Sequence, residues 1–302
     1  MIHRRQFLAG LAAVPALTQD TPDWGGPVLD FHLHPKQGAD GEAAHMKGCG
    51  VTRAVLLTRD SGEAKSHQLA ADQPDKFVYF IGTDTAKPGA VDVLRAAAKN
   101  GARGFGELKS HVAADGPEMK RVYDLAAELG VPVLMHFQVV EHFAAEGTFN
   151  IHIESLPAIL KAHPKTTFIG HADLWWANIS AEVPADVAYP KGPVKKGGLT
   201  DRLLADFPNM YGDCSANSGR NGLGRDPEFT AGFLARHQNK LIFGSDCSCR
   251  DGRGAGQGSQ EPLIKGKCVA RETLAVLKKQ ASPEVFRKIT WVNGNKLLKL
   301  KV

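Results

Sequence analysis

The chain has 302 residues, of which 43% are hydrophobic and 23% charged, and its formal net charge is +5 at pH 7. This length and composition allow a large buried core, and one α/β barrel of roughly 250 residues fits as well as two small domains. The positive charge is modest and is not clustered, which gives no case for nucleic acid or an anionic membrane as a partner.

The first 20 residues have the pattern of an export signal. Arg4-Arg5-Gln6-Phe7-Leu8 opens an apolar run that continues to Leu17, with small residues near Val14-Pro15-Ala16. The pattern resembles a twin-arginine signal peptide, which implies export to the periplasm of an already folded protein; a short amphipathic arm is the alternative. No stretch reaches the length of about 18 apolar residues that a membrane span needs, so the mature protein is predicted to lie outside the membrane.

From residue 27 onward, strand and helix patterns alternate. The predicted strands are short apolar or mixed runs, as expected of parallel strands whose outer face is covered by helices. They lie at 27–33, 52–58, 77–82, 103–108, 131–136, 166–171, 209–214 and 240–245. Helical patterns follow at 61–73, 88–100, 117–129, 153–163, 198–206, 226–237 and 271–280.

Eight strands that alternate with helices predict a closed (β/α)8 TIM barrel of the α/β class. A doubly wound sheet would have fewer strands and a glycine-rich first turn, which is absent here. We therefore predict a single domain over 27–302, with a C-terminal cap at 282–300. Long loops at 172–197 and 247–268 are expected to be functional.

Metal-binding side chains occupy the C-terminal ends of the predicted strands, where barrel enzymes place their catalytic residues. His32 and His34 alternate along the first strand, so their side chains share a face. Imidazole and carboxylate groups bind zinc and neighbouring metals. A lone histidine or glutamate is often purely structural, but the convergence of six such groups on one barrel end favours a metal site. The predicted ligands are His32, His34, Glu107, His136, His171 and Asp246.

The same positions carry a family resemblance. The segments DFHLH (30–34), VLMHF (133–137), FIGHAD (168–173) and LIFGSDCS (241–248) resemble the amidohydrolase superfamily. They are most similar to its amidohydrolase-2 branch, which includes aminocarboxymuconate-semialdehyde decarboxylase-like proteins and metal-dependent hydrolases. The resemblance extends from about residue 27 to the C-terminal Asn293–Leu298 segment.

The resemblance implies one or two divalent ions, with two favoured. Zinc is expected, although these ligand types also accept manganese, iron or cobalt. In members with two ions, a glutamate or a carboxylated lysine bridges them; Glu107 fits this role, and Lys109 is the alternative. His136 and His171 would then hold the second ion. The residues that resemble ligands of a single ion are His32, His34, His136 and Asp246.

The expected reaction is hydrolysis of an amide, ester or lactone in a small molecule. A bound Zn²⁺ lowers the pKa of its water to about 7 and polarises a carbonyl group. Asp246 is the predicted catalytic residue, which takes the proton of the water and returns it to the leaving group. The alternatives are a non-oxidative decarboxylase of the same branch and a non-catalytic binding barrel. A homodimer is compatible with the branch.

Several further residues have weaker assignments. Asp30 is predicted to hold a histidine ring in place through a hydrogen bond. The five cysteines form neither a disulfide framework nor a CxxC motif, and a bridge from Cys247 or Cys249 to Cys214 or Cys268 is favoured over a nucleophilic role. Charged loop residues are often only solvated, but arginines can also clamp a carboxylate. The candidate substrate contacts are Lys109, Trp175, Arg220 and Arg250.

Overall fold

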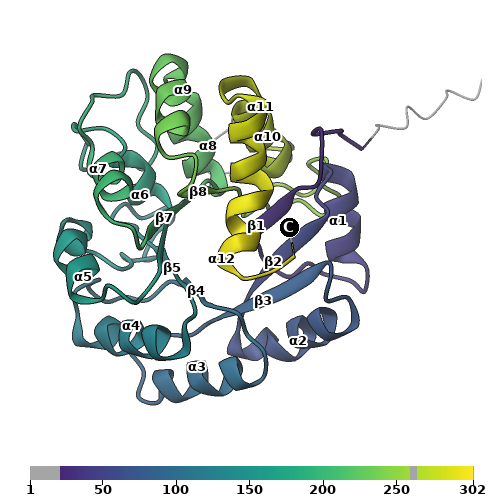
Figure 1. Ribbon diagram of the computed structural model, residues 1–302, viewed down its shortest axis with the longest axis vertical. Helices are drawn as coiled ribbons and strands as arrows, with labels where there is room; N and C mark the ends of the chain where they lie inside the picture. Colours follow the sequence, from purple (N-terminus) through teal and green to yellow (C-terminus); the bar gives the residue numbers. More distant parts are fainter. Residues whose placement is uncertain (1–20, 259–263, 302) are drawn as a thin grey trace, which may run out of the picture.

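The computed structural model describes residues 21–258 and 264–301, so the predicted export signal at 1–20 lies outside the described residues. Eight parallel strands form one sheet in chain order. The amides of Phe31 and Asp246 donate to the carbonyl groups of Phe243 and His32, at 2.9 and 2.7 Å, and join the last strand to the first. The predicted TIM barrel is confirmed (Figure 1). The strands are β1 (Leu29–Leu33), β2 (Arg53–Arg59), β3 (Phe77–Gly82), β4 (Phe105–Leu108), β5 (Val133–His136), β6 (Phe168–His171), β7 (Met210–Asp213) and β8 (Leu241–Ile242).

Helices form a ring outside the strands (Figure 1). None of those in the described part of the chain is long and apolar enough to cross a bilayer. The α-helices are α1 (Gly41–Cys49), α2 (Glu63–Asp72), α3 (Ala90–Lys99), α4 (Pro117–Leu129), α5 (Leu156–Ala162), α6 (Asp173–Ala177), α7 (Leu199–Asp206), α8 (Ala216–Gly224), α9 (Pro227–Arg236), α10 (Val269–Gln280), α11 (Pro283–Arg287) and α12 (Asn293–Leu297). Short 3₁₀ turns η1 (Asp60–Gly62) and η2 (Ile153–Ser155) precede α2 and α5, and a π-helical turn η4 (Lys288–Val292) precedes α12.

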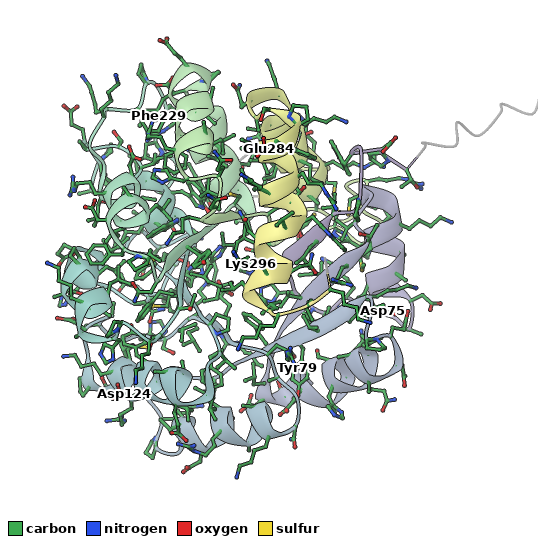
Figure 2. All side chains as sticks on the ribbon, viewed as in Figure 1. Asp75, Tyr79, Asp124, Phe229, Glu284 and Lys296 are labelled. Atoms are coloured by element: carbon green, nitrogen blue, oxygen red, sulfur yellow. The ribbon has the colours of Figure 1, made fainter. Side chains whose placement is uncertain are left out.

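Two apolar layers hold these elements together. Alternate strand residues such as Leu29, Leu134 and Ile169 fill the inside of the barrel, where Trp291 of η4 packs against them. A larger layer lies between the strands and the helices. Burial of this much apolar surface is the main stabilising contribution to the fold. Charged residues such as Asp75, Asp124 and Glu284 lie on the exposed outside of the helical ring (Figure 2).

Local sequence signals predicted the bounds of most strands and helices. The segments β3 and α4 match their predicted ranges residue for residue, and Pro117 and Gly130 flank α4 as expected. The loops contain more helix than their sequence patterns indicated, since α6 lies in the predicted loop 172–197 and α8 follows β7 directly. Helix α6 has only five residues, and α8 contains three glycines, which are poor helix formers.

Candidate metal centre

The six predicted metal ligands converge at the C-terminal end of the barrel. His136 and His171 end adjacent strands and are paired in register. Each lies two residues beyond an inner-layer residue, Leu134 and Ile169, so strand alternation turns both imidazoles inward. This end of the barrel therefore gathers ligands from β1, β4, β5, β6 and the residues after β8.

Irregularities in the backbone of β1 and β4 set the directions of the ligand side chains on these strands. In β1, Asp30 pairs with Ala54 but Leu33 pairs with Leu56, so β1 carries one extra residue. The same shift occurs in β4, between Phe105 and Leu108. An inserted residue breaks the strict alternation of side chains and re-aims those beside it. These irregularities lie directly at His32 and Glu107, two of the predicted ligands.

The ligand atoms form two groups that share a carboxylate. In one group, Nε2 of His34 lies 3.4 Å from Asp246 Oδ1, and Nε2 of His32 lies 3.8 Å from the same oxygen. In the other, Glu107 contacts Nδ1 of His136 and lies 3.3 Å from Nε2 of His171. The second oxygen of Glu107 lies 3.5 Å from His34. Glu107 therefore lies between the two groups, each of which has its ligand atoms within 4.8 Å of one another.

Asp213, which sequence reasoning missed, fixes the orientation of two histidines. It is fully buried at the end of β7, and its Oδ2 lies 2.6 Å from Nδ1 of His32. The Ser215 hydroxyl donates a hydrogen bond to the same oxygen of Asp213 at 2.7 Å. Ser215 Oγ also lies 2.8 Å from Nδ1 of His171. Because the hydroxyl proton is already donated to Asp213, Ser215 accepts this second hydrogen bond from His171. The signal was present, because Asp213 is the polar residue near the end of the seventh predicted strand.

These hydrogen bonds engage Nδ1 of His32, His34 and His171 and turn the Nε2 atom of each ring toward the centre of the site, where a cation could bind. His32 and His171 both carry their proton on Nδ1, and their buried Nε2 atoms have no hydrogen-bond partner within the described residues. The Nδ1 of His34 faces the carbonyl of Leu57 at 3.0 Å, which also leaves Nε2 toward the site. A carboxylate or carbonyl that accepts a hydrogen bond from the other ring nitrogen is the usual partner of a metal-binding histidine. The residues present therefore fit a divalent metal ion.

The charge balance of the site also favours a cation. Although burial raises the pKa of Glu107, its histidine neighbours hold that pKa well below the usual range, so the carboxylate is ionised. Burial lowers the pKa of His171, but Asp213 and Glu107 outweigh burial and raise that pKa to about 10. The same negative potential that favours a proton at this position favours a metal ion.

The sequence matches the family model described as Amidohydrolase over residues 64–300. The chain belongs to the amidohydrolase family. This membership makes the protein an enzyme and confirms the family prediction. The match begins after β1, so the assignment of His32 and His34 as ligands rests on the geometry above. The comparison with curated proteins gives no match.

Solved structures show the same fold at low sequence identity. 2,6-Dihydroxybenzoate decarboxylase from Rhizobium is 13% identical, with a TM-score of 0.55 over 90% of this chain and 98% of that one. A probable 2-pyrone-4,6-dicarboxylic acid hydrolase from Acinetobacter baumannii with bound citric acid is 11% identical, with a TM-score of 0.59 over 91% and 100%. 5-Carboxyvanillate decarboxylase from Novosphingobium aromaticivorans, with bound manganese, is 11% identical, with a TM-score of 0.57 over 93% and 99%. The fold therefore serves both hydrolases and decarboxylases.

In this amidohydrolase, Asp246 is held in an uncommon backbone conformation. Its φ is 45°, in the left-handed region that aspartate tolerates better than most residues. The amide of Asp246 donates to His32 O at 2.7 Å, which ties the aspartate to β1. Gly244 leaves room for this arrangement, because an added Cβ would lie 2.5 Å from Asp213 Oδ1 and 2.6 Å from His32 Cβ. The side chain of Asp246 is 29% exposed and faces the open end of the barrel.

Two depressions reach the site. One, of about 220 Å³, is lined by His136, His171 and Asp246 together with Lys109. The other, of about 370 Å³, is lined by His34, Asp246 and Arg250. Lys109 and Arg250 thus line the depressions at the site, and their contact with substrate stays a prediction.

Lys109 forms a salt bridge with Glu146. Its ammonium group lies 3.0 Å from Glu146 and 4.5 Å from the ring centroid of Phe149. Glu107, by contrast, contacts three of the histidines. The geometry therefore favours Glu107 over a carboxylated Lys109 as the bridging group.

The other two predicted substrate contacts lie elsewhere. Trp175 is fully buried on α6 and packs against Gly170 on the outer face of β6, because the segment is a helix rather than an open loop. Arg220 lies on α8, where it faces Glu272 at 3.8 Å. Neither residue lines the depressions at the metal centre. The burial of Trp175 contradicts its prediction as a substrate contact, whereas Arg220 stays a prediction.

The role predicted for Asp30 is also wrong in detail. Its Oδ1 accepts hydrogen bonds from the backbone amides of His32, at 3.0 Å, and Ser245, at 2.8 Å, rather than from an imidazole. The extra residue in β1 separates Asp30 from the face that His32 occupies. Asp30 thus joins β1 to the β8 end, and Asp213 is the residue that holds the His32 ring.

The predicted disulfide is absent, since all five cysteines are free thiols. Cys214 follows β7, whereas Cys247, Cys249 and Cys268 lie together beside α1.

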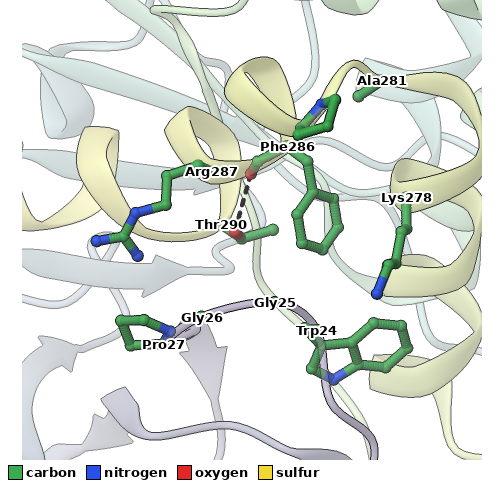
Figure 3. Close-up of a pocket in the computed structure, with 10 residues that line it drawn as sticks. Trp24, Gly25, Gly26, Pro27, Lys278, Ala281, Phe286, Arg287 and Thr290 are labelled. Atoms are coloured by element: carbon green, nitrogen blue, oxygen red, sulfur yellow. Dashed lines mark hydrogen bonds between the residues drawn. The ribbon is translucent and has the colours of Figure 1, made fainter.

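A separate cavity of about 320 Å³ lies between the segment that precedes β1 in the sequence and helices α10 and α11 (Figure 3). Trp24, Phe286 and Arg287 line it, and the Thr290 hydroxyl donates to the carbonyl of Phe286 at 2.8 Å. Its lining includes no histidine, cysteine or carboxylate. This cavity therefore lacks the groups that metal-assisted catalysis requires.

Proposed function

We propose that this amidohydrolase is a metal-dependent hydrolase that cleaves an amide, ester or lactone bond of a small polar molecule. The observation that supports this proposal best is the position of Glu107, which contacts His34 from one ligand group and His136 and His171 from the other. A carboxylate in this position suits a pair of ions. When bound, divalent ions supply Lewis acidity and an activated water.

Asp246 carries the proton in this proposal. Its carboxylate accepts a proton from the attacking water as the new C–O bond forms at the substrate carbonyl. It then gives that proton to the leaving nitrogen or oxygen as the C–N or C–O bond breaks. Its partial exposure gives it access to substrate, while its contact with His34 keeps it beside the metal ligands.

The shape and polarity of the cavity support a small polar substrate. Its volume of about 220 Å³ lies below the roughly 300–1,000 Å³ that is typical of ligand pockets. Two polar atoms of the lining residues, Asn217 Oδ1 and Ser218 Oγ, have no hydrogen-bond partner within the described residues, and a substrate could supply these hydrogen bonds. His142 Nε2 and Asp173 Oδ1 lie 3.6 Å apart and face each other.

Manganese loading tests the two-ion centre, because carboxylate and imidazole ligands accept this metal. We expect electron paramagnetic resonance of the loaded protein to show two spin-coupled ions, as ions about 3.5–4 Å apart do. Glu107→Gln should leave only an uncoupled signal, whereas Glu154→Gln, an exposed change of the same type, should not alter the spectrum. An uncoupled signal in the wild type would contradict the two-ion centre.

A substrate screen separates hydrolysis from decarboxylation. The metal-loaded protein should hydrolyse members of a panel of lactones, cyclic amides and esters. Release of carbon dioxide from aromatic carboxylic acids, without hydrolysis of that panel, would overturn the proposal in favour of a decarboxylase. We also propose twin-arginine export of this enzyme to the periplasm, which cell fractionation tests.

A further inference from the structure

A second group of metal-binding side chains lies beside the barrel, outside the centre described above. It draws its members from three distant parts of the sequence. His45 lies on α1, Cys247 and Cys249 follow β8, and Cys268 precedes the first residue of α10. All four residues are buried, and each side chain is at most 3% exposed.

The ligand atoms are close together. Cys247 Sγ lies 3.2 Å from Cys249 Sγ and 3.8 Å from Cys268 Sγ, and Cys249 Sγ lies 3.6 Å from Nδ1 of His45. The separation of 3.2 Å is closer than unbonded sulfur atoms normally approach. The thiol of Cys49 also contacts that of Cys268.

These separations suit tetrahedral zinc. Zn–S bonds of about 2.3 Å and Zn–N bonds of about 2.0–2.1 Å place two sulfur ligands about 3.8 Å apart, and a sulfur and a nitrogen ligand about 3.6 Å apart. Two of the three observed separations have these values, and the third needs to open by about 0.6 Å to reach the same geometry. The ligand atoms of His45, Cys247 and Cys249 all lie within 4.8 Å of one another, whereas the thiol of Cys268, 3.8 Å from Cys247, lies outside this group and must move toward it to complete the tetrahedron. Three thiols and one imidazole are also a common ligand set of closed structural zinc sites.

We propose that His45, Cys247, Cys249 and Cys268 bind a structural Zn²⁺ ion. On binding, the three thiols lose their protons to solvent and coordinate as thiolates. Nδ1 of His45 now donates to the carbonyl of Cys249 at 3.0 Å, so its proton moves to Nε2, which has no partner within the described residues, and the neutral ring coordinates through Nδ1. Imidazole and thiolate ligands select zinc over the harder ions that suit carboxylates.

The surrounding backbone is arranged around this group. Gln257 Oε1 accepts hydrogen bonds from the amides of Ser248 and Cys249, both at 3.1 Å, and this curls the loop after β8. The same loop packs directly on α1, where an added Cβ at Gly48 would collide with the carbonyl of Asp251. The close fit of loop and helix brings the ligands together.

The ion would also position the catalytic aspartate. Cys247 directly follows Asp246, whose left-handed backbone needs support from its surroundings. Bonds from the ion to Cys247, Cys249 and His45 would anchor this short segment to α1. The zinc site would thus hold the predicted catalytic residue, Asp246, in position. The proposal of this site does not depend on whether the enzyme is a hydrolase.

Cobalt substitution tests the site directly. Full-length protein purified with reductant and loaded with Co²⁺ should show near-ultraviolet thiolate-to-cobalt charge-transfer absorption, which the imidazole and carboxylate ligands of the barrel centre cannot produce. In zinc-loaded protein, X-ray absorption should show sulfur neighbours at about 2.3 Å. Glu107→Gln should retain both signals.

Serine variants identify the ligands. Cys268→Ser should lose most of the charge-transfer absorption, whereas Cys214→Ser, a buried thiol outside the group, should keep it. Absence of the absorption in folded, reduced, cobalt-loaded wild-type protein would overturn the proposal, even if Cys268→Ser fails to fold. Protein purified with zinc could instead have a mass lower by two hydrogen atoms and no zinc bound to sulfur. This result would assign a disulfide and would also overturn the proposed zinc site.

Discussion

Asp213 Oδ2 lies 2.6 Å from Nδ1 of His32 and also accepts a hydrogen bond from Ser215 at 2.7 Å. A single buried carboxylate oxygen thus sets the tautomer of His32 and, through the serine, that of His171. Both rings then turn Nε2 toward the centre of the site, where a metal ion would replace the second proton that the raised pKa keeps on His171.

Asp213→Asn should therefore weaken metal binding. The amide keeps the size of the side chain but removes the charge that favours the Nδ1–H tautomer of His32. We expect the affinity of the site for manganese to fall by about 10- to 100-fold, the usual effect of losing such a partner. Titration of the metal-free protein measures this, and Asp206→Asn, an exposed change of the same type, is the control. Equal affinities in Asp213→Asn and wild type would contradict the role of Asp213.

Gly244→Ala should damage both stability and the site. The added Cβ would lie 2.5 Å from Asp213 Oδ1 and 2.6 Å from His32 Cβ, so side chains in a rigid layer would have to move. Overpacking of this kind costs about 1–3 kcal/mol of unfolding free energy. Urea unfolding and metal content measure the two effects. The control is Gly224→Ala, because a Cβ there meets only Val276 at 3.9 Å, and a loss of similar size in that variant would refute this explanation.

Asp246→Asn should keep the fold and remove most turnover. Asparagine tolerates the left-handed backbone at this position, but its amide cannot take up a proton. Loss of a general base typically costs about 10²- to 10⁴-fold in rate. Steady-state kinetics on the best substrate of the hydrolysis panel measures the loss, and circular dichroism checks the fold. A variant with wild-type kcat would exclude Asp246 as the proton carrier.

Asp201→Asn should reveal a pH-dependent contribution to stability far from the active site. Burial raises the pKa of Asp201, but His237 and Arg236 outweigh burial and hold it below the ordinary value of 3.8. The ionised form therefore stabilises the fold above pH 3.8, and this stabilisation disappears as the pH falls through the lower folded-state pKa. We expect the variant to lose about 1 kcal/mol at pH 7.

The comparison across pH is the test. Urea unfolding at pH 7 and near pH 3 should show a gap between wild type and Asp201→Asn that shrinks in acid. Asp206→Asn, at the last residue of the same helix, should show no such trend. A gap that is constant with pH would mean that the carboxylate charge is not what stabilises this contact.

Much of the catalytic end was readable from local patterns. Several of the short apolar runs that form strands end in a polar residue, as in His136 and His171. Because parallel strands of a barrel end on the same rim, a polar residue at each strand end predicts a shared site without any knowledge of contacts. That reasoning predicted six ligands, whose side chains the structure brings together, but it passed over Asp213, which ends the seventh strand in the same way.

The sequence by itself determined the alternation of strands and helices, and with it the rim on which the ligands meet, because apolar periodicity is a local property of the chain. Only the tertiary structure decided which residues touch. The extra residues in β1 and β4, the burial of Trp175 and the pairing of His32 with Asp213, 181 positions away, depend on contacts between distant segments. The group of buried thiols around Cys247 is of the same kind, since its members have no regular spacing and meet only when the loop after β8 packs against α1.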